Sequence, residues 1–386
     1  MAASDGWVVS WTASCSGHQG GLSGPESTVR QTMRISMGGS ALRLRFANPY
    51  TYSPLVFDAV TVALSDGHGA GLDSRPLPVT VSGRTRFAVH PGAVVTTDAV
   101  PLATTDLTTI ALSIYTSQQV ELSSHDWANR TRWSSLTATG DHTNDVSGEA
   151  FRPAGFDWLW VDAVDVLDPD ARGAVVVLGD SITDGAGADF GTDTRWTDFL
   201  AERFAGLPAG DQRRRAVANA GIGGNTVGGL GTSLVGANAL TRLERDVLSQ
   251  AGLSEVVVLE GSNDIYLGAA PEDLAADLTT VADRIHAHDV RALVTTIPPR
   301  RGGYLWDDYH ETRRQRANAW IRSQTAFDAV LDLDPVLDDP SSPGRLRPDL
   351  DADGTHPNTA GNRAIAESID LTLLTGDPAS TRKEAR

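Results

Sequence analysis

Residues 175–185 read VVVLGDSITDG, and this stretch decides the fold of the second half of the chain. The apolar run at its start is rich in β-branched residues and predicts a buried strand, which the small and polar residues after Leu178 end abruptly. Ser181 therefore stands just past the carboxyl end of the strand. Because ligands bind at that end of an open α/β sheet, we expect the Ser181 hydroxyl group to face a crevice.

Strand-like and helix-like segments alternate after Gly173, which predicts a parallel sheet with helices on both faces. The predicted strands are residues 174–178, 216–219, 255–259, 292–297 and 329–333. The predicted helices are residues 195–204, 239–249, 271–288, 311–323 and 359–374. The third of these helices carries apolar residues at helical spacing, with Pro271 in its first turn.

The first part of the chain, from Trp7 to about Gly148, has a different pattern. Short runs such as LRLRF at 42–46 and VTVAL at 60–64 alternate in polarity, and turn-forming residues separate them. A period of two with one apolar face predicts half-buried antiparallel strands, and no helix-like stretch intervenes. This part is therefore predicted to be an all-β sandwich or jelly roll.

The boundary between the two parts is predicted near a polar turn at 168–173. Residues 156–161 before it are predicted as the last strand of the sandwich. A chain of 386 residues is long for one core. We accordingly predict a β-sandwich domain at 1–168 and an α/β domain at 169–386.

Composition excludes several classes of partner. The formal charge of −17 argues against nucleic acid or an anionic membrane surface, because either needs a basic footprint. No apolar run reaches the roughly 18 residues of a membrane-spanning helix, so no membrane insertion is expected. Residues 1–6 lack the basic and apolar regions of an export signal. The localisation therefore stays open between a cytoplasmic protein and a secreted protein whose signal has been removed. The sequence does not predict an oligomeric state.

No metal or cofactor is expected. Cys15 is the only cysteine, so neither an intrachain disulfide nor a thiolate zinc site can form. Residues 349–354 resemble the start of a calcium-binding loop, but the position of its closing glutamate is Ala360. The glycine-rich residues 221–231 lack the Gly-Lys-Ser/Thr ending of a phosphate-binding loop.

Three further polar stretches follow predicted strands or precede a helix. Residues 219–226 read NAGIGGNT, and their glycines let backbone N–H groups approach a ligand closely. GSND at 261–264 closes a strongly apolar strand, and DGTHPN at 353–358 stands ahead of the last helix. In the last stretch, a carboxylate three residues before His356 can accept from one ring nitrogen and leave the other free to take a proton from a serine.

The four stretches together resemble the SGNH, or GDSL, hydrolase superfamily, which is named for a Ser, a Gly, an Asn and a His in four separated blocks. GDSI at 179–182 is similar to the first block, with Ile182 in place of the usual Leu. The other three blocks resemble, in the family's order, residues 219–224, 261–264 and 353–356. The resemblance covers residues 174 to about 374 and implies a flavodoxin-like parallel-sheet hydrolase domain.

The resemblance also implies roles for individual residues. It implies that Ser181 is the nucleophile, that His356 is a general base that later acts as an acid, and that Asp353 orients this base. The oxyanion hole would consist of the Ser181 and Gly224 backbone N–H groups and the Asn263 side-chain amide. We choose Gly224 over the glycine before it because it ends the Asn-x-x-x-x-Gly spacing. The implied reaction is acyl transfer to water through an acyl-serine.

These residues also have a purely structural interpretation. Ser181 could cap the helix after its strand, since a Gly-Asp-Ser string alone is more often a turn than a nucleophile. Three carboxylates beside the blocks are expected to accept hydrogen bonds from loop amides: Asp180, Asp184 and Asp264.

The loop after the fourth strand, residues 298–306, is expected to overhang the crevice beside Ser181. Tyr304 and Trp306 are predicted to contact substrate, by stacking on a sugar or by walling an acyl pocket, and Arg300 by meeting an acidic group. The alternative is that all three only cover the edge of the sheet. No long apolar lid is visible in the sequence, which favours short acyl groups.

The leading hypothesis is a serine esterase whose substrate is a small-molecule or carbohydrate ester with a short acyl group such as acetyl. The two-domain layout is similar to that of some microbial carbohydrate esterases. The alternatives are a lipase or lysophospholipase for longer acyl chains and a non-catalytic carbohydrate-binding protein. Six tryptophans in or near the first domain either form a sugar platform or, as we favour for most of them, fill the core: Trp7, Trp11, Trp127, Trp133, Trp158 and Trp160.

Overall fold

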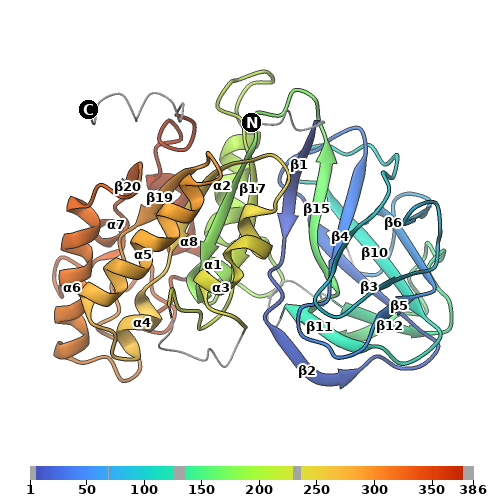
Figure 1. The fold of residues 1–386 in the computed structure, drawn as a ribbon, viewed down its shortest axis with the longest axis horizontal. Helices are drawn as coiled ribbons and strands as arrows, with labels where there is room; N and C mark the ends of the chain where they lie inside the picture. The colour runs from blue at the N-terminus through green and yellow to red at the C-terminus, as the bar shows by residue number, and fades with distance from the viewer. Residues whose placement is uncertain (1–5, 68, 126–134, 229–235, 377–386) are drawn as a thin grey trace. The chain divides into compact units, whose positions relative to one another are not determined.

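The computed structural model describes residues 6–67, 69–125, 135–228 and 236–376 (Figure 1). The chain divides into two compact units, an N-terminal unit of residues 5–169 with 190–193 and a C-terminal unit of residues 170–189 with 194–386. Each unit is described by itself. The predicted ranges 1–168 and 169–386 stay a prediction as domains.

The C-terminal unit is built on a five-stranded parallel sheet, as the sequence predicts. Its strands in chain order are β16 (Ala174–Gly179), β17 (Ala216–Gly221), β18 (Leu253–Leu259), β19 (Arg291–Thr295) and β20 (Ala329–Leu331). Across the sheet they stand in the order β17-β16-β18-β19-β20. Because this is the doubly wound order 2-1-3-4-5, the winding direction reverses beside β16, and ligands of such sheets bind at that point.

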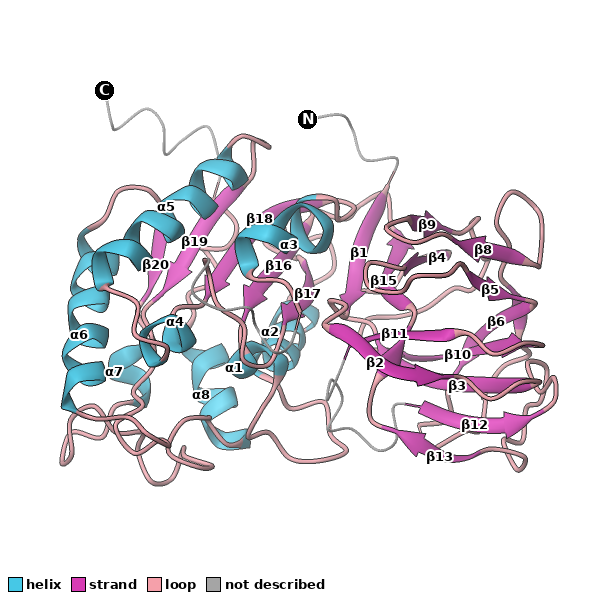
Figure 2. Ribbon diagram, turned by 60° about the horizontal axis from the view of Figure 1, so that its bottom comes forward, coloured by secondary structure: helices cyan, strands magenta, loops and turns pink. Residues whose placement is uncertain are grey.

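All five predicted helices of this unit are present, and three short ones were not predicted. The helices are α1 (Ser181–Asp184), α2 (Trp196–Ala205), α3 (Ala239–Leu243), which continues as the π-helix η1 (Glu244–Leu248), α4 (Ser262–Tyr266), α5 (Pro271–His286), α6 (Asp308–Ser323), α7 (Asp334–Leu337) and α8 (Thr359–Ser368). One turn is too short to show a helical period, so α1, α4 and α7 have no sequence signal. Figure 2 shows α3 and α5 on one side of the sheet and α2 and α8 on the other.

The core of the C-terminal unit follows from the pattern of its elements. The apolar residues of β16 are completely buried, as expected for a central strand covered on both faces. Helix α5 turns one apolar stripe inward, and its members are at most 1% exposed: Leu274, Leu278, Val281 and Ile285. The predicted end of the last helix at 374 is wrong, because α8 ends at Ser368 and the guanidinium of Arg203 binds the Ala366 and Ile369 carbonyl oxygens there.

The N-terminal unit consists of strands that pair antiparallel, as predicted. They are β1 (Trp7–Thr12), β2 (Gly17–Leu22), β3 (Ser27–Arg34), β4 (Leu42–Ala47), β5 (Leu55–Phe57), β6 (Ala59–Leu64), β7 (Leu77–Pro78), β8 (Phe87–Val89), β9 (Val94–Thr96), β10 (Thr109–Thr116), β11 (Glu121–His125), β12 (Ser135–Thr139), β13 (Arg152–Gly155), β14 (Trp158–Leu159) and β15 (Val161–Leu167). The larger sheets have the orders β13-β12-β3-β10-β6-β7 and β1-β15-β4-β9. The stacking of these sheets as a sandwich or jelly roll stays a prediction.

The predicted last strand at 156–161 is wrong in its bounds. Trp160 has a φ of 66°, a conformation rare for a bulky residue, and it separates β14 from the longer β15. Its backbone N–H and its indole N–H donate to the Ser123 and Glu121 carbonyl oxygens at 2.7 and 2.9 Å. Tertiary hydrogen bonds therefore hold a break that the apolar run does not indicate.

Three of the six tryptophans fill the core of this unit, as we favoured. Trp11, Trp158 and Trp160 are at most 4% exposed, and the rings of Trp11 and Trp158 meet edge to face with centroids 4.9 Å apart. Trp7 is half-buried beneath the guanidinium of Arg43. The other two, Trp127 and Trp133, lie outside the described residues.

Candidate active site

The turn after β16 places Ser181 at the start of a helix. Asp180 is the N-cap of α1, and its Oδ1 accepts from the Ile182 backbone N–H at 2.9 Å. Ser181 is thus the first residue of the helix, and the interpretation that Ser181 itself is the cap is wrong. Asp180 therefore accepts from a backbone amide, as expected, but this amide belongs to the first turn of α1 and not to a loop.

Ser181, His356 and Asp353 come together, although 175 positions separate the serine from the histidine in the chain. The Ser181 Oγ lies 2.9 Å from His356 Nε2, and His356 Nδ1 lies 2.8 Å from Asp353 Oδ2. The other carboxylate oxygen, Asp353 Oδ1, accepts from the His356 and Thr355 backbone N–H groups at 2.9 and 3.0 Å. This geometry lets His356 take a proton from Ser181 while the carboxylate orients the ring.

The loop that follows α1 packs against the turn that carries His356. Gly187 has a φ of 90°, and a Cβ there would lie 2.9 Å from the His356 Cβ and 2.5 Å from the Pro357 carbonyl oxygen. Only a glycine allows this approach. Sequence reasoning missed Gly187, and its one signal was the small-residue run GAGA at 185–188.

The Asp353 carboxyl is ionised more easily than a free aspartate. Partial burial works to raise its pKa, but the hydrogen bonds from the His356 ring and backbone and the charge of His356 together lower this pKa below its ordinary value. The side chain of Asp353 is 54% exposed and that of His356 is 21% exposed, so the site opens to water.

The glycines after β17 differ in what their N–H groups do. The Gly223 N–H donates to Asp184 Oδ2 at 3.0 Å, which confirms the loop-amide expectation for this aspartate. The Gly224 N–H, in a residue with a φ of 73°, donates no hydrogen bond within the described part of the chain, and the same holds for the Ser181 N–H. These two groups are therefore available as donors, and the oxyanion role of Gly224 stays a prediction.

Asn263 lies in the first turn of α4 and is hydrogen-bonded to Asn225, the residue that follows Gly224. Its Nδ2 donates to the Asn225 carbonyl oxygen at 2.9 Å, and its Oδ1 accepts from Arg300 Nη1 at 3.3 Å. The two hydrogen bonds fix the amide plane and leave the second N–H of Nδ2 for a ligand. Asp264, the next residue, accepts from the Val227 and Gly228 backbone N–H groups, as expected.

Arg300 supports Asn263 and does not extend into solvent. Its Nη1 also donates to Ser262 Oγ at 3.0 Å, and its guanidinium lies 4.8 Å from the Tyr266 ring centroid and 5.1 Å from that of Trp306. Trp306 is only 7% exposed, in contrast to Tyr304 at 78%. Substrate binding by these residues stays a prediction.

The loop that carries Arg300 and Tyr304 packs on the turn of the histidine. A Cβ on Gly303 would collide with the Thr355 side chain, and one on Gly354 would collide with the Gly302 backbone. Four exposed apolar side chains gather on this loop and on the segments next to it: Leu267, Tyr304, Leu305 and Tyr309. The loop therefore brings apolar surface to the edge of the site.

Beneath the site lie three buried carboxyl groups. Burial raises the pKa of Asp180 to about 7 and that of Asp264 to about 6, although backbone N–H groups oppose both shifts. Burial and the charge of Asp180 raise the pKa of Glu260 well above its ordinary value, against the charge of Arg242. Sequence reasoning missed Glu260 and Arg242, and the one signal for Glu260 was a charge at the end of the apolar run 255–260.

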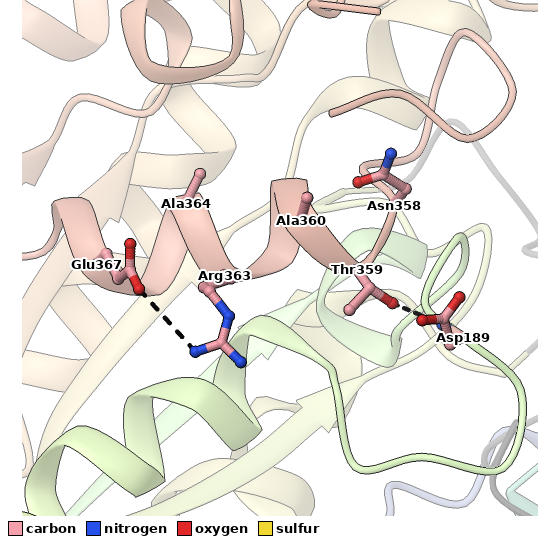
Figure 3. Close-up of a pocket in the computed structure, with 7 residues that line it drawn as sticks. All are labelled: Asp189, Asn358, Thr359, Ala360, Arg363, Ala364 and Glu367. Carbon is pink, nitrogen blue, oxygen red and sulfur yellow. Dashed lines mark hydrogen bonds and ion pairs between the residues drawn. The ribbon is translucent and has the colours of Figure 1, made fainter. Parts of the chain in front are cut away.

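A separate pocket of about 520 Å³ lies along the outer face of α8 (Figure 3). It is lined by Asp189, Asn358, Thr359, Ala360, Arg363, Ala364 and Glu367. Thr359 Oγ1 accepts from the Asp189 backbone N–H at 3.0 Å, which closes one end. Since the three residues of the triad do not line it, this pocket is distinct from the site.

No group of three or more His, Cys, Asp or Glu side chains within the described ranges is placed to hold a metal ion.

None of the helices in the described residues has the length and the apolar composition that crossing a membrane requires.

Comparisons with known proteins find a matching family model and several similar proteins. The sequence model of the GDSL-like lipase/acylhydrolase family matches residues 177–364. Esterase TesA of Pseudomonas aeruginosa is 29% identical over 205 residues, which are 53% of this chain and 89% of the relative. The native aryl esterase of M. smegmatis is 19% identical, with a TM-score of 0.40 over 55% of this chain and 98% of its own. Est24, a carbohydrate acetylesterase from Sinorhizobium meliloti, is 16% identical, with a TM-score of 0.39 over 55% of this chain and 98% of its own.

Proposed function

The chain belongs to the SGNH/GDSL hydrolase superfamily and is a carboxylic ester hydrolase, and we propose that it hydrolyses short-chain acyl esters through an acyl-enzyme on Ser181. The observation that carries this proposal is the chain of contacts from Ser181 Oγ to His356 Nε2 at 2.9 Å and from His356 Nδ1 to Asp353 Oδ2 at 2.8 Å. An unassisted serine hydroxyl is a weak nucleophile, and these contacts supply the base and its orienting group.

In the first half of the reaction, His356 Nε2 takes the Ser181 proton while Oγ bonds to the ester carbonyl carbon. The carbonyl oxygen becomes an oxyanion, which the Ser181 and Gly224 N–H groups and the Asn263 amide would stabilise. The intermediate then collapses: the bond to the alcohol oxygen breaks, and His356 gives that oxygen its proton. The alcohol leaves and the acyl group stays on Ser181.

In the second half, water takes the place of the alcohol. His356 removes a proton from the water, whose oxygen bonds to the acyl carbon, and the same donors stabilise the second oxyanion. When the bond to Oγ breaks, His356 returns the proton to Ser181. The carboxylic acid leaves and the enzyme is restored.

The polar character of the site supports a short acyl group. The residues that adjoin Ser181, Gly224 and Asn263 in the chain are mostly polar or charged, such as Asp180, Asn225 and Asp264. A long acyl chain would bind through apolar surface, because burying each methylene group contributes about 0.8 kcal/mol of favourable free energy. We propose acetylated carbohydrate as the natural substrate class, since the two-part layout is similar to that of some microbial carbohydrate esterases.

One observation favours the second candidate, hydrolysis of longer acyl chains. The exposed side chains Leu267, Tyr304, Leu305 and Tyr309 could hold a chain that extends beyond the polar centre. A panel of p-nitrophenyl esters from acetate to palmitate distinguishes the two, because kcat/KM should fall with chain length for the first function and rise for the second.

The test of the mechanism is hydrolysis of p-nitrophenyl acetate by the wild type and by Ser181→Ala. We expect Ser181→Ala to lose nearly all activity while keeping its thermal unfolding profile. Ser323→Ala is the matched control, because that hydroxyl is exposed on α6 and binds only carbonyl oxygens of its own helix. Equal rates for Ser181→Ala and the wild type would eliminate the proposed nucleophile. Release of acetate from acetylated xylan, measured against the same control, tests the carbohydrate substrate.

A further inference from the structure

One arginine lies completely buried beneath the proposed oxyanion hole. We propose that Arg242 is a positioning residue, whose guanidinium group holds the strand end before Ser181 in register with the turn that carries Gly224. The inference rests on the proposed function, because it matters only if those residues perform the reaction.

Arg242 binds three acceptors that belong to three parts of the site. Its Nη2 donates to the Gly179 carbonyl oxygen at 3.1 Å, at the end of β16. Its Nη1 donates to the Ala220 carbonyl oxygen at 2.6 Å, near the end of β17, and its Nε donates to Asn225 Oδ1 at 3.0 Å. Because the guanidinium is planar and rigid, these hydrogen bonds fix the two strand ends and the turn relative to one another.

Asn225 passes this constraint on to the proposed donors. Its side chain also donates to the Ala237 carbonyl oxygen at 2.9 Å, so Asn225, which is completely buried, is held at both ends of its amide. Its carbonyl oxygen accepts the Nδ2 group of Asn263, and Gly224 is its neighbour in the chain. Arg242 therefore sets the position of Asn225, and Asn225 sets the positions of one backbone donor and one side-chain donor.

The local fold is shaped to bring Arg242 to this place. The first residue of α3, Ala239, donates its backbone N–H to the Thr226 carbonyl oxygen of the turn, and the π-helix η1 begins two residues after Arg242. Short π-helical segments are often found at functional sites. Two buried carboxyl groups face the guanidinium, Asp246 at 3.5 Å and Glu260 at 3.6 Å.

A second buried arginine in the same unit provides a matched control. The side chain of Arg314 on α6 is as completely buried as that of Arg242, and it also binds two carboxylates and one carbonyl oxygen: Glu311, Asp334 and Ile297. None of these partners belongs to the proposed triad or oxyanion hole, although Glu311 also accepts from the Trp306 indole N–H at 3.2 Å. Comparison of the two arginines separates positioning of the site from general stabilisation of the fold.

The first experiment compares Arg242→Lys with Arg314→Lys on p-nitrophenyl acetate. Lysine keeps the charge, but a single ammonium cannot bind three acceptors in one plane. We expect Arg242→Lys to lower kcat about tenfold to a hundredfold with KM within about twofold, because a displacement of about 1 Å at a reacting centre costs that much. Arg314→Lys should keep kcat even where its melting temperature falls. Equal kcat values for Arg242→Lys and Arg314→Lys would overturn the proposal.

A double-mutant cycle with Asn263→Ala distinguishes positioning of the oxyanion hole from a purely structural role, because it measures whether the two substitutions lower kcat independently. If Arg242 acts through the oxyanion hole, adding Arg242→Lys to Asn263→Ala should lower kcat less than about threefold further. If the double variant instead loses kcat by the product of the two single losses, Arg242 acts elsewhere than through the oxyanion hole.

Two arms keep the outcome clear. If Arg242→Lys does not fold, Asn225→Ala takes its place, because it removes the acceptor of Arg242 Nε. Asn225→Ala should lower kcat by itself but should not lower it further in a protein that already carries Asn263→Ala. An unchanged kcat for Asn225→Ala would overturn the proposal. Ser181→Ala is measured alongside. An active Ser181→Ala defeats the proposed function, whereas an inactive Ser181→Ala beside a fully active Arg242→Lys defeats this inference alone.

Discussion

Asp180, the residue before Ser181, carries a carboxyl group that the fold buries, and its replacement by asparagine should stabilise the protein above neutral pH. The residue is 1% exposed. Asn keeps a side-chain oxygen that can accept the Ile182 N–H, so the helix cap survives. What Asp180→Asn removes is the charge that the folded protein must bury once the carboxyl ionises.

The magnitude follows from the pKa of Asp180. Burial raises it to about 7, against the Ile182 N–H and the charge of Arg300, whereas an unfolded aspartate titrates near 3.9. Between these two values the folded state binds a proton that the unfolded state has lost, so the free energy of unfolding falls as the pH rises through this window. The full difference corresponds to about 4 kcal/mol, of which about 3 kcal/mol develops between pH 5 and pH 8.

The assay is urea unfolding of the wild type and Asp180→Asn at pH 5, 6, 7 and 8. The free energy of unfolding of the variant minus that of the wild type should grow by about 3 kcal/mol from pH 5 to pH 8 and level off above the folded pKa. Asp289→Asn is the control, because it removes the same charge from an exposed residue whose φ of 57° suits asparagine.

A difference that stays constant from pH 5 to pH 8 would refute the reasoning, because it would mean that Asp180 ionises as easily in the folded state as in the unfolded one. A control that reproduces the same growth would refute it too. In that case the net charge of the protein, and not the burial of this carboxyl, would be the cause.

Four further substitutions test the site and the core. Asn263→Ala should lower kcat by about a hundredfold to a thousandfold, as loss of one oxyanion donor does, and an unchanged kcat on p-nitrophenyl acetate would remove the residue from the hole. Asp353→Asn should also lower kcat by about a hundredfold or more, because the amide no longer orients the His356 ring; a wild-type rate would show that the carboxylate is dispensable. Gly187→Ala would place a Cβ 2.9 Å from the His356 Cβ, so kcat should drop with the fold retained, and steady-state kinetics beside circular dichroism checks both. Leu278→Ala should lower the free energy of unfolding by about 2 to 5 kcal/mol in urea, while a loss below about 1 kcal/mol would contradict its place in the core.

The sheet and the candidate triad residues could be predicted from the sequence because their signals come from residues that are neighbours in the chain. A run of β-branched residues that stops at Gly179 can only be a buried strand with a turn behind it, so the position of Ser181 follows from neighbouring residues. The turn from Asp353 to His356 is local in the same way, since three residues bring the carboxylate to the ring. The pairing of Ser181 with His356 was expected because this turn leaves one ring nitrogen free for a serine, and the resemblance to a family implied the same pair.

Other features depend on contacts between residues far apart in the chain, and no local pattern announces them. Trp160 breaks a predicted strand because two carbonyl oxygens of β11 accept hydrogen bonds from its backbone N–H and its indole N–H. Gly187 is required only because the His356 turn packs against it.

The sequence by itself thus determined the class of the second half, the strands that build its sheet, and the side chains that carry the proposed chemistry. Only the tertiary structure decided how those side chains are supported. Arg242 reads in the sequence as one more charge on a helix, yet the fold buries it between two strand ends and a turn. The reason is that burial and hydrogen bonding of a charged group depend on which distant segments surround it, and that is a property of the packed chain.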